Sequence, residues 1–301
     1  MDSLKQIEKL IEGKQAAAKI AVVAAHDMDV LSSVKEVYEK GYAEPLLIGD
    51  REGILRIADE IGMDISHVTI IKELEDAQSA RIAVDLINGG EANILMKGYL
   101  HTAELLRITL DKEKGLRAGN LISHVSVFEV DRHPKLFMLT DAGINIAPDL
   151  RQKMEIIKNA VGVANRLGIT RPKVAALSAL ELVNPDMQSS VDAALLSKMA
   201  QRGQIKGCVV DGPLALDNAV DMDAALHKQI ESEVAGDADI LLVPDIESGN
   251  ILYKGLVYLN KAKTCSLIMG ARVPIVATSR ADDSGAKYYS ILLAIASLNN
   301  Q

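Results

Sequence analysis

The chain has 301 residues, 49% of them hydrophobic and 25% charged, so it can bury either one large core or two ordinary ones. A formal net charge of −8, with no Trp and two Phe, argues against a nucleic-acid-binding surface, which needs cationic and stacking side chains. No apolar stretch reaches the roughly 20 residues of a membrane span, and the charged first residues do not resemble a signal peptide. We therefore expect a cytoplasmic protein with no membrane contact.

Short β-branched runs alternate with helical patterns along the chain. Strands are predicted at 20–24, 45–49, 68–71, 94–96, 123–130, 136–140, 174–178, 207–211, 240–244, 265–269 and 274–277. The longer predicted helices span 30–40, 76–88, 150–167, 187–202, 250–261 and 286–298, with an amphipathic helix at 1–14. This alternation predicts an α/β fold built from βαβ units with a largely parallel sheet.

The interval 123–140 differs from the rest, because two strands flank a short polar turn and so predict a hairpin. A hairpin inside parallel structure suggests a change of domain. We place one crossing near Gly119 and a return near Gly270. The prediction is a first α/β domain of residues 1–119 plus 270–301, and a second of residues 120–269.

Polar residues follow the predicted strands, where open α/β sheets bind their ligands. They include Lys97, His101 and Thr102, then Asp141 and Asn145, and further along the chain Asp211, Asp245, Ser248 and Asn250. With the turn 279–285, these loops are predicted to converge on an interdomain cleft. Turns are polar in any protein, and Asp141, Asp211 and Asp245 each have the alternative role of capping a helix.

The turn after the last strand contains Ser279, Arg280, Asp282, Asp283 and Ser284. Backbone N–H groups at a helix start, next to an arginine, can bind a phosphate-like anion, and a carboxylate beside it can accept a proton. The alternative is an ordinary helix cap, since Ser and Asp are common where helices start.

The loop 97–102 has a Lys-Gly pair that allows the backbone to approach a ligand closely. Alternatively, His101 packs at a domain boundary, Thr102 caps the next helix, and Arg107 on that helix faces solvent. No G-x-G-x-x-G, Walker-type or G-x-S-x-G motif occurs, and the six His lack metal-ligand spacing, so no metal is expected.

Taken together, five segments resemble the phosphate acetyl/butyryltransferase family through nearly the whole chain. They are 97–102 (KGYLHT), 141–148 (DAGINIAP), 210–219 (VDGPLALDNA), 244–254 (PDIESGNILYK) and 278–282 (TSRAD). The resemblance implies a two-domain fold like that of isocitrate and isopropylmalate dehydrogenases, and a homo-oligomer. It also implies that acyl-CoA and phosphate are the substrates, with no cofactor beyond CoA itself.

By the same resemblance, Ser279 and Arg280 bind phosphate or stabilise the transition state, with Thr102 and Arg107 as further ligands. Acetyl-specific relatives have an aspartate, implicated as the base, at the position of Ala286. In this chain, Asp282 or Asp283 takes the place of that aspartate as the base, or the CoA thiol is activated without a side-chain base. This departure favours the butyryl over the acetyl branch. The rivals are a phosphate acetyltransferase, a metal-dependent dehydrogenase of the same fold, whose ligand set we do not find, and a non-catalytic anion-binding protein.

Overall fold

A computed structural model describes residues 1–12, 18–131, 133–279 and 282–298. The chain divides into two compact units. The first unit consists of Lys5–Asn120 and Cys265–Gln301, and the central unit of Leu121–Thr264 together with Met1–Leu4. The first residues join the central unit because Ser3 and Leu4 donate hydrogen bonds to the Glu129 carboxylate at 2.9 and 2.8 Å.

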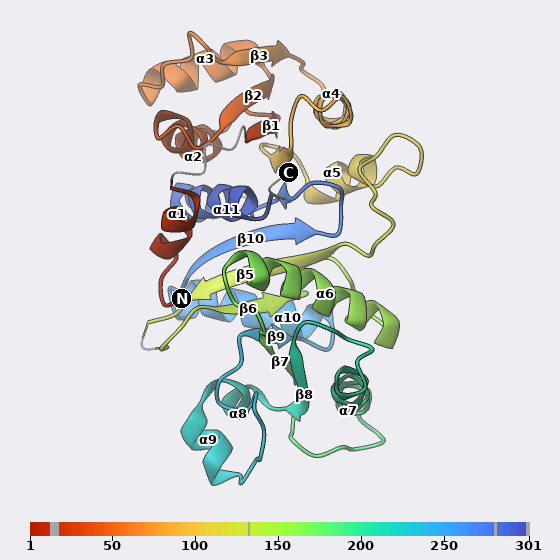
Figure 1. Cartoon of the computed structure of the whole chain (residues 1–301). Helices are drawn as coiled ribbons and strands as arrows, with labels where there is room; N and C mark the ends of the chain where they lie inside the picture. Colours follow the sequence, from red (N-terminus) through yellow and green to blue (C-terminus); the bar gives the residue numbers. More distant parts are fainter. Residues whose placement is uncertain (13–17, 132, 280–281, 299–301) are drawn as a thin grey trace. The chain divides into compact units, whose positions relative to one another are not determined.

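The strands of the first unit are parallel apart from one antiparallel strand (Figure 1). Its strands in spatial order are β3 (Thr69–Lys72), β2 (Glu44–Gly49), β1 (Lys19–Val23), β4 (Ile94–Lys97), β11 (Ile275–Val276) and the antiparallel β10 (Lys263–Met269). Its helices are α1 (Lys5–Ile11), α2 (Met28–Glu39), α3 (Arg51–Glu60), α4 (Asp76–Asn88), α5 (Thr102–Thr109) and α11 (Ser284–Ala296).

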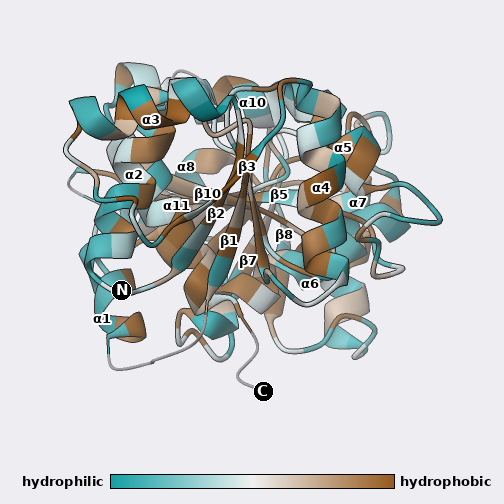
Figure 2. Ribbon diagram, turned by 90° about the horizontal axis from the view of Figure 1, so that it is seen from above, coloured by the Kyte–Doolittle hydropathy of each residue, from teal (hydrophilic) through white to brown (hydrophobic). Residues whose placement is uncertain are grey.

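Apolar strands between amphipathic helices form the core of this unit. Helices α1, α2, α3 and α11 lie on one face of the sheet, and α4 and α5 on the other (Figures 1 and 2). The strands are largely brown in Figure 2, whereas the helices carry brown and teal stretches, as expected for helices with one buried stripe. In the described part of the chain, no helix is both long and apolar enough to cross a membrane.

The central unit combines a hairpin with parallel strands. Strand β5 (Ser123–Glu129) pairs antiparallel with β6 (Phe137–Thr140), so the predicted hairpin is confirmed. The order then continues through β9 (Ile240–Leu242), β7 (Lys173–Leu177) and β8 (Val209–Leu214), all parallel to β6. Its helices are α6 (Leu150–Arg166), α7 (Gln188–Gln201), α8 (Leu216–Val220), α9 (Met222–His227) and α10 (Ile246–Lys254), the last continuing into a π-helical turn, η1 (Gly255–Leu259).

Two predicted boundaries in the central unit are wrong. The helix predicted from Asn250 begins at Ile246, because Asp245 is its N-cap and accepts the Ser248 N–H at 2.8 Å. The strand predicted to end at Asp211 continues to Leu214, which places Asp211 inside β8. The short helices α3, α8 and α9 were not predicted, because their apolar patterns extend over too few residues.

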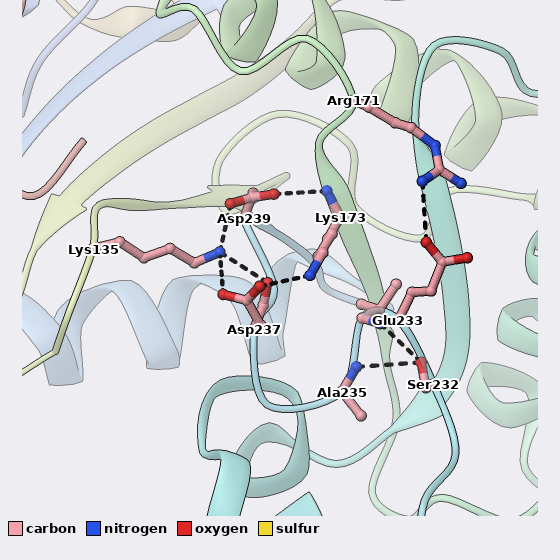
Figure 3. A network of polar contacts seen from close by, with 9 residues as sticks. Lys135, Arg171, Lys173, Ser232, Glu233, Ala235, Asp237 and Asp239 are labelled. Carbon is pink, nitrogen blue, oxygen red and sulfur yellow. Dashed lines mark hydrogen bonds and ion pairs between the residues drawn. The ribbon is translucent and has the colours of Figure 1, made fainter.

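An ion network joins the strand starts of the central unit (Figure 3). The Lys135 ammonium lies 2.7 Å from Asp237 and 2.6 Å from Asp239, and the Lys173 ammonium lies 2.6 Å from Asp237. Asp239 also accepts the backbone N–H of Lys173 at 2.8 Å. These charges sit beside the first residues of β6, β7 and β9, so the network fixes the register of three strands.

We expect Lys135→Met to lower the free energy of unfolding by about 1–2 kcal/mol at neutral pH, because the mostly buried Asp239 loses its cation. Burial tends to raise the pKa of Asp237, but hydrogen bonds from Lys135 and Lys173 outweigh it and hold that pKa below its ordinary value. Such stabilisation is present above the carboxyl's unfolded-state pKa and is lost as pH falls through the folded-state pKa.

Denaturant titrations between neutral and acid pH measure this effect. The wild type should lose stability on acidification, and Lys135→Met should lose less. Arg171→Met is the control: the Arg171–Glu233 pair is exposed, so its removal should cost no more than about 0.5 kcal/mol. If the two variants lost the same free energy of unfolding, the stabilising role assigned to Lys135 would be contradicted.

Candidate active site

In the first unit, the end of β4 turns sharply into α5. Backbone N–H groups of Gly98 and Tyr99 donate to the carbonyls of Val23 and Ala24 at 2.8 and 2.9 Å. A Cβ on Gly98 would lie 2.3 Å from the Ala24 carbonyl oxygen, so only glycine fits here without a shift. The buried Lys97 ammonium donates to the carbonyls of Gly98 and Leu100 at 3.1 and 3.3 Å. Lys97 therefore stabilises the turn that carries the next candidate residues.

Those residues lie at the start of α5. His101 is exposed and occupies the N-cap position without a side-chain cap bond, and Thr102 is the first helical residue. The alternative role of Thr102 as the cap is therefore wrong. Arg107 is exposed over 70% of its side chain, and its nearest carboxylate, Glu104, is 3.9 Å away. This agrees with the solvent-facing alternative for Arg107 in the described structure.

The turn between β11 and α11 carries the remaining first-unit candidates. Asp282 is 8% exposed and accepts the Ser279 N–H at 2.8 Å, while its own N–H donates to the Ser279 carbonyl at 3.2 Å. Asp283 is the N-cap of α11 and accepts the Ala286 N–H at 2.8 Å, and Ser284 is the first helical residue. Arg280 lies outside the described residues. Both carboxylates therefore take part in folding this turn.

In the central unit, Asp141 organises the loop after β6. The residue is 2% exposed, and its carboxylate accepts the backbone N–H groups of Gly143, Ile144 and Asn145 at 3.0, 3.0 and 3.1 Å. The Asn145 amide donates to the same carboxylate at 2.6 Å and to the Ile122 carbonyl at 2.9 Å. Four donors on one carboxylate hold this loop in a single conformation.

The start of α10 packs directly against the Asp141 loop. Asp245 accepts both the N–H and the hydroxyl of Ser248 at 2.8 Å. The Asn250 amide donates to the Ala142 carbonyl at 3.4 Å, and a Cβ on Gly249 would lie 3.0 Å from the Ala142 Cα. The structure thus brings together five candidates from two loops, which are Asp141, Asn145, Asp245, Ser248 and Asn250.

Asp211 does not join this group. Its carboxylate accepts the Gly212 N–H at 2.8 Å and the Ser197 hydroxyl at 3.2 Å, so its contacts lie within β8 and with α7. The expectation that Asp211 follows a strand end is wrong for this reason. The predicted interdomain cleft stays a prediction.

Sequence reasoning missed His124. Because β5 runs antiparallel to β6, the first residues of β5 lie beside the last residues of β6, and the Thr140 hydroxyl donates to the His124 carbonyl at 2.8 Å. The residues that follow strands do not include His124, although the predicted hairpin implies that a strand start shares this edge. Among the residues that the structure describes, no group of three His, Cys, Asp or Glu side chains is placed to hold a metal ion.

Comparison with known proteins identifies the family. Residues 72–295 match the family described as phosphate acetyl/butaryl transferase. The phosphate butyryltransferase of Clostridium acetobutylicum is 46% identical over 292 residues, covering 97% of each chain. The phosphate acetyltransferase of Thermotoga maritima is 47% identical over 289 residues, covering 96% of this chain and 98% of the relative.

Solved structures agree with this assignment. A branched-chain phosphotransacylase from Enterococcus faecalis superposes with a TM-score of 0.81 at 35% identity, over 93% of this chain and 98% of the other. A 4-hydroxythreonine-4-phosphate dehydrogenase from Klebsiella pneumoniae superposes with a TM-score of 0.58 at 14% identity, over 93% of this chain and 100% of the other. At this identity, the similarity shows only that the two proteins share a fold. The predicted α/β fold of the isocitrate dehydrogenase type is confirmed. The chain therefore belongs to the phosphate acetyl/butaryl transferase family, a family of phosphate acyltransferases.

Proposed function

We propose that the protein is a phosphate butyryltransferase, which converts butyryl-CoA and phosphate reversibly into butyryl phosphate and CoA. The observation that carries this proposal is the similarity to a phosphate butyryltransferase over 97% of the chain. Ala286, at the position where acetyl-specific relatives have an aspartate, gives it further support.

In the first unit, we assign phosphate binding to Ser279 and Arg280, with Thr102 and Arg107 as further ligands. The support is chemical: a guanidinium and the N–H groups at the start of α11 suit a phosphate oxyanion. Substrate binding is also assigned to three residues near the ends of β4 and β11, which are Lys97, His101 and Ser284. Asp282 and Asp283 accept backbone N–H groups of the turn, which favours a positioning role for both.

In the central unit, substrate binding is assigned to the Asp141 loop and the start of α10. Asn145, Ser248 and Asn250 carry polar groups on segments whose backbone is fixed by Asp141 and Asp245. Segments held in this way present their polar groups to a substrate without reorganisation during the reaction. Asp211, held inside β8, has the weakest support of the six central-unit candidates.

The alternative is a phosphate acetyltransferase, which the 47% identical relative from Thermotoga maritima favours. One methylene in an apolar pocket changes selectivity by only about 1–3 kcal/mol, so the two enzymes need few differences in sequence. We propose a preference for acyl chains of three to five carbons, on the order of 10-fold or more in kcat/KM over acetyl.

Thiol release from butyryl-CoA, acetyl-CoA and hexanoyl-CoA, with and without phosphate, tests this function. We expect release to require phosphate and to be fastest with butyryl-CoA. Faster turnover of acetyl-CoA would select the acetyltransferase. Release independent of phosphate would reject the reaction, and binding of phosphate without any turnover would indicate a non-catalytic anion-binding protein.

We also propose a homo-oligomer. Exposed apolar side chains of the central unit support it, among them Leu182, Leu226, Ile251 and Leu259, which are 65–87% exposed. Light scattering of the purified chain measures its mass, and a monomer at micromolar concentration would contradict this proposal.

A further inference from the structure

None of the roles assigned so far in the first unit removes the proton from the CoA thiol. Toward acyl-CoA, the CoA thiol must lose its proton before its sulfur attacks the acyl carbonyl, since the thiolate is the nucleophile. Ala286 carries no proton acceptor. Asp282 and Asp283 each accept a backbone N–H of the turn at 2.8 Å, which favours a positioning role for both.

His124 lies among the assigned substrate-binding residues of the central unit. It is the second residue of β5 and is half-buried at the strand end where the Asp141 loop begins. A Cβ on Gly143 would lie 3.7 Å from the His124 ring, in ordinary van der Waals contact, so the Asp141 loop passes directly beside the ring. The Tyr253 ring, one turn beyond Asn250 on α10, has its centroid 6.1 Å from that of His124.

The ring is also held from its own strand. The Nδ1 atom lies 3.3 Å from the hydroxyl of Ser126, which is fully buried and two residues along β5 on the same face. The serine hydroxyl can donate or accept, so this contact holds the orientation of the ring; in the tautomer in which Nδ1–H donates to it, Nε2 carries the lone pair that can accept a proton. Beside the ring, the titratable group of the loop after β6 is Asp141, whose carboxylate is bonded within its own loop. Helix α10 carries Glu247, Tyr253 and Lys254 and is capped by Asp245, and the Lys254 ammonium lies 5.8 Å from the Tyr253 ring.

We propose, on the basis of the phosphate acyltransferase function above, that His124 is the general base for the CoA thiol. The S–H bond breaks and its proton passes to Nε2 of the imidazole. The sulfur forms a bond to the acyl carbon, and the tetrahedral intermediate collapses with cleavage of the bond between that carbon and the phosphate oxygen. Phosphate leaves with that electron pair, and the imidazolium returns its proton to phosphate or water. In the opposite direction, the imidazolium protonates the departing thiolate.

The test is the pH dependence of kcat/KM for butyryl phosphate and CoA in the wild type and in His124→Gln. We expect the variant to be slower by roughly 100-fold at pH 7, the lower end of what a general base supplies. The deficit should shrink as pH rises toward 9–10, because the thiol then ionises without a base. The matched control is His227→Gln, since His227 is exposed at the end of α9 and should leave the profile unchanged.

The outcomes separate this inference from the proposed function. If the wild type shows no phosphate-dependent transfer, the function itself fails. If the wild type is active and His124→Gln loses less than 10-fold at pH 7, or loses the same factor at every pH, His124 is not the base. If the Gln variant melts well below the wild type, imidazole rescue of His124→Ala decides: a saturable gain in rate supports the proposal, and no gain overturns it.

Discussion

Replacing Arg280 by alanine is expected to lower kcat/KM for phosphate-dependent thiol release by roughly 100-fold or more, the effect of losing one charge-assisted contact in the transition state. Phosphate carries its charge through every stage of the proposed reaction, and the guanidinium is the cation that the family resemblance assigns to it. The measurement is the initial rate at several phosphate concentrations with butyryl-CoA. Most of the loss should appear in kcat at saturating phosphate if the contact strengthens in the transition state.

Two further variants complete this experiment. Arg280→Lys keeps the charge but removes the planar fork of donors, so its activity should lie between those of the wild type and Arg280→Ala. Arg171→Ala is the matched control, because this arginine is exposed and pairs with Glu233 at 3.0 Å on the surface of the central unit. Activity of Arg280→Ala within a few-fold of that of Arg171→Ala would remove Arg280 from the proposed phosphate site.

The regular parts of the fold were predictable because each depends on a local pattern. Runs such as 94–96 and 240–242 are uniformly apolar, as strands buried on both faces must be, and α4 begins and ends where its pattern predicts. The hairpin could be predicted because only five residues separate its two predicted strands. The pairing of Val125 with Thr140 follows from that short turn.

The arrangement of the candidate residues was less predictable because it depends on contacts between distant segments. The contact of Asn250 with Ala142 joins segments 108 residues apart, and no local pattern encodes it. Asp211 appeared to follow a strand, but the strand continues through Gly212 and Pro213, residues that usually end one. His124 was missed because an antiparallel partner brings a strand start, rather than a strand end, to the edge where we propose substrate binding.

Among single substitutions that add a methyl group at the end of β4, we expect Gly98→Ala to be the most destabilising. The new Cβ would lie 2.3 Å from the Ala24 carbonyl oxygen and 2.4 Å from that of Val23, and both are backbone atoms at the end of β1 that cannot rotate away. The backbone must therefore shift, which we expect to lower the free energy of unfolding by about 2–4 kcal/mol. Because the Lys97 ammonium is bonded to Gly98 and Leu100 in this turn, the start of α5 should move as well.

The matched control for this prediction is Gly89→Ala at the end of α4. A Cβ there would have its nearest neighbour, the Asp85 carbonyl oxygen, at 3.4 Å, and the φ of −76° suits any residue. This variant should stay within about 0.5 kcal/mol of the wild type in denaturant-induced unfolding followed by circular dichroism. Gly98→Ala should also lose phosphate-dependent activity under conditions in which it remains folded, because Thr102 and Arg107 move with α5. A variant with wild-type stability and activity would mean that β1 and β4 separate at this point with little cost, and the close approach of their backbones would then have no role in positioning α5.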